Sequence, residues 1–95
     1  STGGIYGRTV VAADSGTATV KRSAGGYGLH IIISHGNGYT TYYAHLSAAT
    51  ISSGAKVSKG QAIGRVGNSG RSTGPHLHFE IRKNNSPKNP MSYFR

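Results

Sequence analysis

The stretch LHIIISHGNGYTTYYAH, from Leu29 to His45, decides the fold. Two runs rich in β-branched and aromatic residues flank a short turn, and the Asn-Gly step at positions 37 and 38 is a strong hairpin signal. The runs therefore predict two antiparallel strands, over Leu29–Ser34 and Tyr39–His45. Because side chains alternate along a strand, every second residue from Tyr39 to His45 should lie on one face.

The rest of the chain repeats this pattern of short runs between turns, and no segment shows an amphipathic helix period. Further strands are expected in Thr9–Ala13, in Thr17–Arg22, twice within Ala55–Gly67 and in the run after Gly74-Pro75, whereas Ser47–Gly54 is expected to be a connector and the tail to be turn-rich. The fold class predicted is all-β, a compact antiparallel β-sandwich or partly open barrel of short strands. At 95 residues, positions 1–95 make one small domain.

The charge is strongly one-sided, with 11 Lys and Arg residues against 2 acidic residues, for a formal net charge of +9. Such a surface attracts polyanions. The basic residues occur singly or in pairs, and the tyrosines show no RNA-binding pattern, so no specific nucleic-acid partner is expected. Cysteine is absent, which excludes disulfides and thiolate chemistry.

The run GPHLHFEI, from Gly74 to Ile81, places two histidines and a carboxylate on one strand face. Zinc is commonly held by imidazole and carboxylate groups, and a catalytic zinc keeps three protein ligands and a water. One of His76 and His78 can bind metal while the other handles protons. Glu80 is either a partner that orients an imidazole or half of an ion pair with a Lys or Arg.

The other histidines have plainer interpretations. His45 reaches the same cleft if its strand neighbours the His76–Ile81 strand, and is otherwise a polar residue at a strand end. His35 is expected to be a solvent-facing turn residue whose replacement by Ala does nothing measurable, and His30 to be a surface residue. Asp14, beside Ser15-Gly16, is expected to be a turn carboxylate.

Two motifs carry a family resemblance: Tyr-x-His-Leu at Tyr43–Leu46 and Gly-x-His-x-His-Phe at Gly74–Phe79. With the segments around them, they resemble the lysostaphin-type, or LytM-like, zinc metallo-endopeptidases from about Thr9 onward. That family hydrolyses peptide bonds in bacterial cell-wall peptidoglycan. The resemblance implies an extracellular, cell-wall or periplasmic location, with peptidoglycan peptides as partners and anionic wall polymers as a further attraction for the basic surface.

The resemblance also implies roles for particular residues. His78 would be a ligand of Zn²⁺, and His45 and His76 would be the catalytic histidines that activate water and stabilise the transition state. Residues at the positions where the family lines its substrate groove are Tyr43, Asn68 and Ser69.

By the resemblance, the Asp of the family's remaining His-x-x-x-Asp zinc motif should fall at or just before Ser1 and the His earlier still, and STGGIYGR supplies neither. The expectation is therefore a LytM-like peptidase domain truncated on its N-terminal side, with an incomplete zinc site. It would be part of a zinc-dependent endopeptidase, or a non-catalytic module that binds peptidoglycan or regulates a hydrolase, or a domain completed by a second chain or a swapped segment. The hairpin VSKGQAIGRVG is similar to that of lipoyl carrier domains, but lacks their lysine at the hairpin tip with Met beside it.

Overall fold

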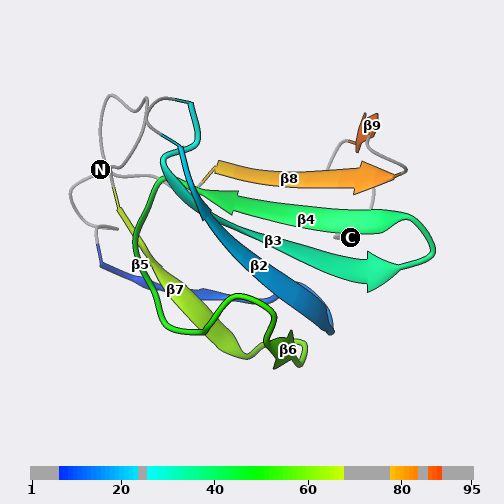
Figure 1. Ribbon diagram of the computed structural model, residues 1–95, viewed down its shortest axis with the longest axis horizontal. Helices are drawn as coiled ribbons and strands as arrows, with labels where there is room; N and C mark the ends of the chain where they lie inside the picture. The colour runs from blue at the N-terminus through cyan, green and yellow to red at the C-terminus, as the bar shows by residue number, and fades with distance from the viewer. Residues whose placement is uncertain (1–6, 24–25, 68–77, 84–85, 89–95) are drawn as a thin grey trace.

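The computed structural model describes residues 7–23, 26–67, 78–83 and 86–88, which form strands and turns (Figure 1). The strands are β1 (Thr9–Val11), β2 (Gly16–Arg22), β3 (Leu29–Gly36), β4 (Tyr39–Ala44), β5 (Leu46–Ala49), β6 (Lys56–Val57), β7 (Ala62–Val66), β8 (His78–Lys83) and β9 (Ser86–Lys88). Within these residues there is no helix, and so none with the length and apolar character that crossing a membrane requires.

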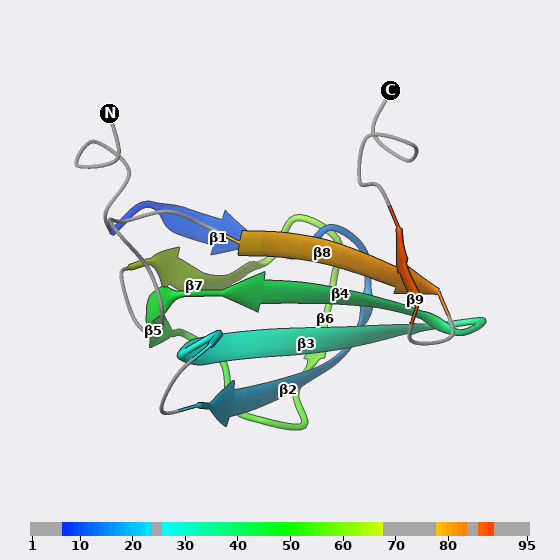
Figure 2. The ribbon, with the colours of Figure 1, turned by 90° about the horizontal axis from the view of Figure 1, so that it is seen from above.

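The predicted hairpin forms the centre of the larger sheet. Its strand order is β6-β2-β3-β4-β8-β9, with every pairing antiparallel. Figure 2 shows β2, β3, β4 and β8 side by side. The turn between β3 and β4 has Asn37 at φ 54° and Gly38 at φ 80°. Two successive positive φ angles are what a tight hairpin of the expected twist requires, so the Asn-Gly prediction is confirmed.

The smaller sheet has the order β1-β7-β5, and its third strand was not predicted. The segment expected to be a connector begins with β5, which pairs with β7 through a bulge between Leu46 and Ala48. Small side chains give LSAA little intrinsic strand preference. The pairing is possible because the backbones approach closely: a Cβ on Gly64 would stand 2.7 Å from the Ala48 carbonyl oxygen.

One residue, His45, carries the chain from the larger sheet to the smaller one. It stands between the end of β4 and the start of β5, and its φ is +61°. This left-handed conformation is uncommon outside glycine, although histidine adopts it more readily than most residues. It ends the alternation of β4, so the prediction that His45 shares a face with Tyr43 is wrong.

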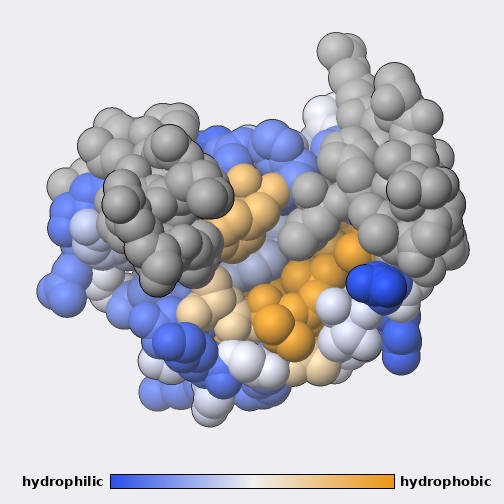
Figure 3. Space-filling view, turned by 180° about the vertical axis from the view of Figure 1, so that it is seen from behind, coloured by the Kyte–Doolittle hydropathy of each residue, from blue (hydrophilic) through white to orange (hydrophobic). Residues whose placement is uncertain are grey.

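The core lies between the two sheets, where the inward faces of the strands meet. Its fully buried large side chains are Tyr43, Ile31, Ile33, Leu46 and Ile63. Seen from behind, apolar side chains gather in a hollow of the molecule between more polar surroundings (Figure 3). The all-β prediction is confirmed as two packed antiparallel sheets, and the sheets do not close into a barrel.

Candidate functional site

The face of the larger sheet turned away from the core carries a row of polar side chains on β8. His78, Glu80 and Arg82 alternate with core-facing residues, as the sequence predicts. In the register with β4, His78 lies opposite Ala44 and Glu80 opposite Tyr42. We call this the outer face. The pairing of β8 with β4 along its whole length holds these side chains on a regular support.

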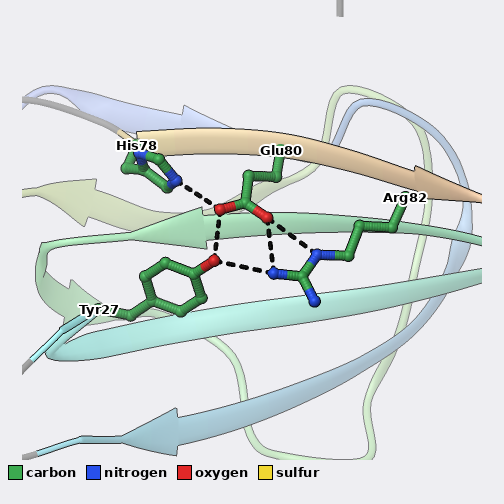
Figure 4. A network of polar contacts seen from close by, with 4 residues as sticks. All are labelled: Tyr27, His78, Glu80 and Arg82. Carbon is green, nitrogen blue, oxygen red and sulfur yellow. Dashed lines mark hydrogen bonds and ion pairs between the residues drawn. The ribbon is translucent and has the colours of Figure 1, made fainter. Parts of the chain in front are cut away.

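Glu80 is the centre of a hydrogen-bond network on the outer face (Figure 4). Its Oε2 atom is 2.6 Å from Nε2 of His78 and also accepts a hydrogen bond from the hydroxyl of Tyr27. Its Oε1 atom accepts from Nε of Arg82 at 2.9 Å and lies 2.8 Å from Nη2. Both interpretations of Glu80 are therefore right at once, since it orients an imidazole and forms an ion pair.

This network keeps Glu80 ionised. Burial by itself would raise the pKa of the carboxyl group, but the hydrogen bonds from Tyr27, His78 and Arg82 outweigh it and lower the pKa to about 2. An ionised carboxylate only accepts hydrogen bonds, so Nε2 of a neutral His78 carries the proton that points at Glu80. The lone pair of that imidazole is then on Nδ1, available to a metal or a proton donor.

Tyr27 belongs to this network, and the sequence analysis did not single it out. Its hydroxyl also accepts a hydrogen bond from Nη2 of Arg82 at 2.9 Å, and burial raises the pKa of the phenol, so the hydroxyl keeps its proton. Its ring contacts the ring of His78, with the centroids 5.4 Å apart. The sequence signal for Tyr27 was the segment GYG, in which one aromatic residue lies between two glycines. Glycine tolerates positive φ angles, and Gly26 and Gly28 have φ angles of +61° and +63°.

His45 is brought to the same place from the corner between the sheets. Its ring centroid is 5.9 Å from that of His78, and the rings are nearly perpendicular. Only 6% of the residue is exposed. Its backbone N–H donates to the Tyr27 carbonyl at 2.9 Å, and its carbonyl accepts from the N–H of Gly67 at 3.0 Å. Two backbone hydrogen bonds therefore fix the chain at His45, where it passes from the larger sheet to the smaller one.

Of the other predicted site residues, Tyr43 alone lies among the described residues. Tyr43 is a core residue, 1% exposed, with its ring against Phe79, so its burial contradicts a place in a substrate groove. His76, Asn68 and Ser69 lie outside the described residues.

Two histidines expected at the surface have structural partners instead. His30 is 5% exposed, lies under the edge of the Tyr27 ring, and donates through Nδ1 to the carbonyl of Gly28 at 2.9 Å. His35 is half-buried and bridges two segments, because Nδ1 donates to the Ser15 carbonyl at 2.7 Å and Nε2 is 2.7 Å from the Thr41 hydroxyl. Tertiary neighbours cover both rings.

Asp14 is a turn carboxylate, as expected, and its Oδ1 accepts a hydrogen bond from the Ser15 N–H at 2.8 Å. It lines a cavity of about 550 Å³ together with His35, Tyr39 and Lys59. That cavity opens at the opposite end of β4 from Ala44, which pairs with His78. It is therefore separate from His45 and His78.

Zinc chemistry needs three protein donors around one point. Among the described residues, no three His, Asp or Glu side chains gather in that way. The donor chemistry of His78 does fit a metal ligand, because a carboxylate on one imidazole nitrogen is the usual support for a ligand on the other. The described part of the chain thus supplies one fitting donor and not a whole site.

Comparison with known proteins shows which family the chain belongs to. Residues 3–90 match peptidase family M23. The chain belongs to that family. It is 51% identical over 86 residues to the DD-carboxypeptidase/endopeptidase Mpg of Neisseria meningitidis, an alignment that covers 90% of this chain and 20% of that protein. The resemblance inferred from the two histidine motifs is therefore confirmed.

Two further similar proteins have different named functions. The murein hydrolase activator EnvC of Escherichia coli is 35% identical over 91 residues, covering 96% of this chain and 22% of that protein. A zinc-containing peptidase from Vibrio cholerae superposes with a TM-score of 0.83 at 36% identity, over 87% of this chain and 26% of that one. The chain thus spans about a fifth of the length of its curated relatives.

Proposed function

We propose that this M23 chain is most of the catalytic domain of a zinc-dependent endopeptidase that hydrolyses peptide bonds in bacterial cell-wall peptidoglycan. The observation that carries the proposal is the pairing of His45 and His78, whose ring centroids are 5.9 Å apart although the two residues come from separate segments. A buried histidine held in a left-handed conformation beside a carboxylate-supported histidine is typical of a functional site.

His78 is the metal ligand in this proposal, with Nδ1 as its lone-pair nitrogen. Zinc, when bound, lowers the pKa of a water molecule and polarises the scissile carbonyl. His45, with His76, accepts a proton from the attacking water and donates a hydrogen bond to the oxyanion that develops. Because 6% of His45 is exposed, bulk water competes little for those hydrogen bonds.

The family's two further zinc ligands match no residue of this sequence, so in this proposal a further segment or a second chain completes the site. Asn68 and Ser69 remain proposed groove residues. The proposed setting is the periplasm or the cell wall, where peptidoglycan peptides are the substrate. The formal charge of +9 also favours anionic wall polymers as a non-specific attraction, and that binding should weaken from low to physiological ionic strength.

Two measurements on the purified chain test the catalytic proposal. If a second copy of the chain completes the zinc site, elemental analysis after dialysis against a mild chelator should find close to one zinc per chain. Incubation with purified peptidoglycan should release new amino termini, detected by mass spectrometry. His45→Ala should abolish cleavage and retain zinc, whereas His78→Ala should lose zinc as well. Lys56→Gln, an exposed residue of β6, is the control that should change neither result.

A second candidate is a non-catalytic module that binds peptidoglycan or regulates a wall hydrolase, as the similarity to an activator favours. The absence of a three-donor cluster among the described residues favours it too. This candidate predicts no zinc and no cleavage, but faster peptidoglycan hydrolysis when the chain is added to a separate wall hydrolase. Zinc with cleavage would exclude it.

A further inference from the structure

We propose that Tyr27 is a positioning residue that holds both described histidines of the site, an inference that rests on the proposed function only for its effect on catalysis. Tyr27 lies between β2 and β3, outside any strand. It nevertheless contacts His45 through its backbone and His78 through its ring, and its hydroxyl binds the Glu80 carboxylate that contacts His78. These two sets of contacts are independent of each other, so each can be tested separately.

The contact with His45 is made by the main chain. The Tyr27 carbonyl accepts the His45 N–H at 2.9 Å. A residue with φ +61° at a corner between two sheets needs such a partner, because its N–H has left the ladder of β4. This hydrogen bond survives any substitution of the Tyr27 side chain.

The contact with His78 is made by the side chain. The Tyr27 hydroxyl and Nε2 of His78 share Oε2 of Glu80 as their acceptor. Arg82 closes the ring of contacts by donating to the Tyr27 hydroxyl at 2.9 Å and to Oε1 of Glu80. The carboxylate therefore cannot rotate without breaking the hydrogen bonds to Tyr27 and Arg82. The imidazole that depends on it is fixed in orientation and tautomer.

Two glycines orient the Tyr27 side chain toward the outer face. Gly26 and Gly28 have positive φ angles on either side of it, a conformation that side chains rarely tolerate. The Gly28 carbonyl accepts from the N–H of Ser23 at 3.0 Å and from Nδ1 of His30. Two changes of backbone direction thus aim one aromatic ring across the outer face, where it also meets the edge of Tyr42.

Two substitutions separate the hydroxyl from the ring. Tyr27→Phe removes the hydrogen bonds to Glu80 and Arg82 and keeps the ring, whereas Tyr27→Leu removes both. Tyr39→Phe is the matched control, because Tyr39 lies at the other end of β4, opposite Lys83. All four proteins can be made with ¹⁵N-labelled histidine, and the tautomer of His78 can be read from long-range ¹H–¹⁵N correlations at neutral pH.

We expect wild type and Tyr39→Phe to show His78 in one tautomer, with the proton on Nε2. Tyr27→Phe should show a mixture of tautomers, and Tyr27→Leu should also broaden the His78 ring signals. The His45 backbone amide shift should stay in place in Tyr27→Phe. A wild-type His78 spectrum in Tyr27→Phe would overturn the proposal, and since that variant keeps the ring, it decides the matter even if Tyr27→Leu does not fold.

Failure of the positioning role and failure of the catalytic proposal give different results. If the chain cleaves peptidoglycan, Tyr27→Phe should lower kcat about 10-fold or more with KM little changed, which is the usual cost of losing a group that orients a metal ligand. If the chain does not cleave, the tautomer change should still be seen, and only the catalytic proposal falls. Unchanged kcat together with an unchanged His78 tautomer would exclude Tyr27 from both roles.

Discussion

The carboxylate of Glu80 lies 2.6 Å from Nε2 of His78, two residues away on the same face of β8. Spacing along one strand makes this contact possible, since alternate side chains share a face. The contact fixes the imidazole only because two further residues hold the carboxylate in place. These are Tyr27, from the segment between β2 and β3, and Arg82, two residues further along β8. The outer face of the sheet thus contains an imidazole of fixed orientation.

The stability of the protein should fall on acidification, because of Glu80. Its pKa is about 2 in the folded protein, below the ordinary value of 4.5, so the unfolded chain binds more protons between these values. The stabilisation of the folded protein by the ionised Glu80 carboxylate is complete above about pH 4.5 and is lost as the pH falls toward 2. Urea denaturation between about pH 2.5 and about pH 6, a range that covers most of that window, should show a shallower pH dependence for Glu80→Gln.

His35→Ala should destabilise the fold, contrary to the expectation of no measurable effect. The ring bridges the Ser15 carbonyl and the Thr41 hydroxyl, so its loss leaves both without that partner. We expect a loss of about 1–3 kcal/mol in the free energy of unfolding, measured by urea denaturation. His35→Gln should lose less, because its amide can replace one of the two hydrogen bonds. Equal stability of His35→Ala and wild type would contradict the bridge.

Tyr43→Phe should lower stability and leave peptide preference unchanged, because Tyr43 is a core residue. Its hydroxyl accepts the Ala13 N–H at 2.9 Å and is 2.8 Å from the Thr41 hydroxyl. Removing it leaves a partly buried N–H without that acceptor, at a cost of about 1–3 kcal/mol. Thermal unfolding measures the first effect. A change in cleavage pattern at unaltered stability would restore Tyr43 to the groove.

Gly67→Ala should disrupt the corner at His45 more than a glycine substitution elsewhere. A Cβ on Gly67 would stand 2.2 Å from the Ser47 backbone nitrogen, so the backbone must shift, and the Gly67 N–H that donates to the His45 carbonyl should shift with it. Gly54→Ala is the control, because its φ of +91° carries strain but its Cβ meets nothing within 4 Å. We expect the His45 amide signal to move in Gly67→Ala and to stay in Gly54→Ala.

Local patterns in the sequence determined most of the fold. Alternating β-branched and aromatic runs predicted β2, β3, β4 and β7, and the Asn-Gly step predicted the hairpin turn. These features depend on neighbours in the chain, which is why they can be recognised without the structure. The strand β5 was missed because small side chains give no such pattern, and its pairing depends on the close approach of Gly64.

The family, and with it the zinc-ligand role proposed for His78, also follows from the sequence through the two histidine motifs. What only the tertiary structure decided is which groups surround those histidines. The left-handed turn at His45 moved its ring away from Tyr43, packing covered His30 and His35, and the Gly26 and Gly28 turns brought Tyr27 to Glu80. Contacts between residues 53 positions apart, as Tyr27 and Glu80 are, depend on how the sheet is assembled and not on local periodicity.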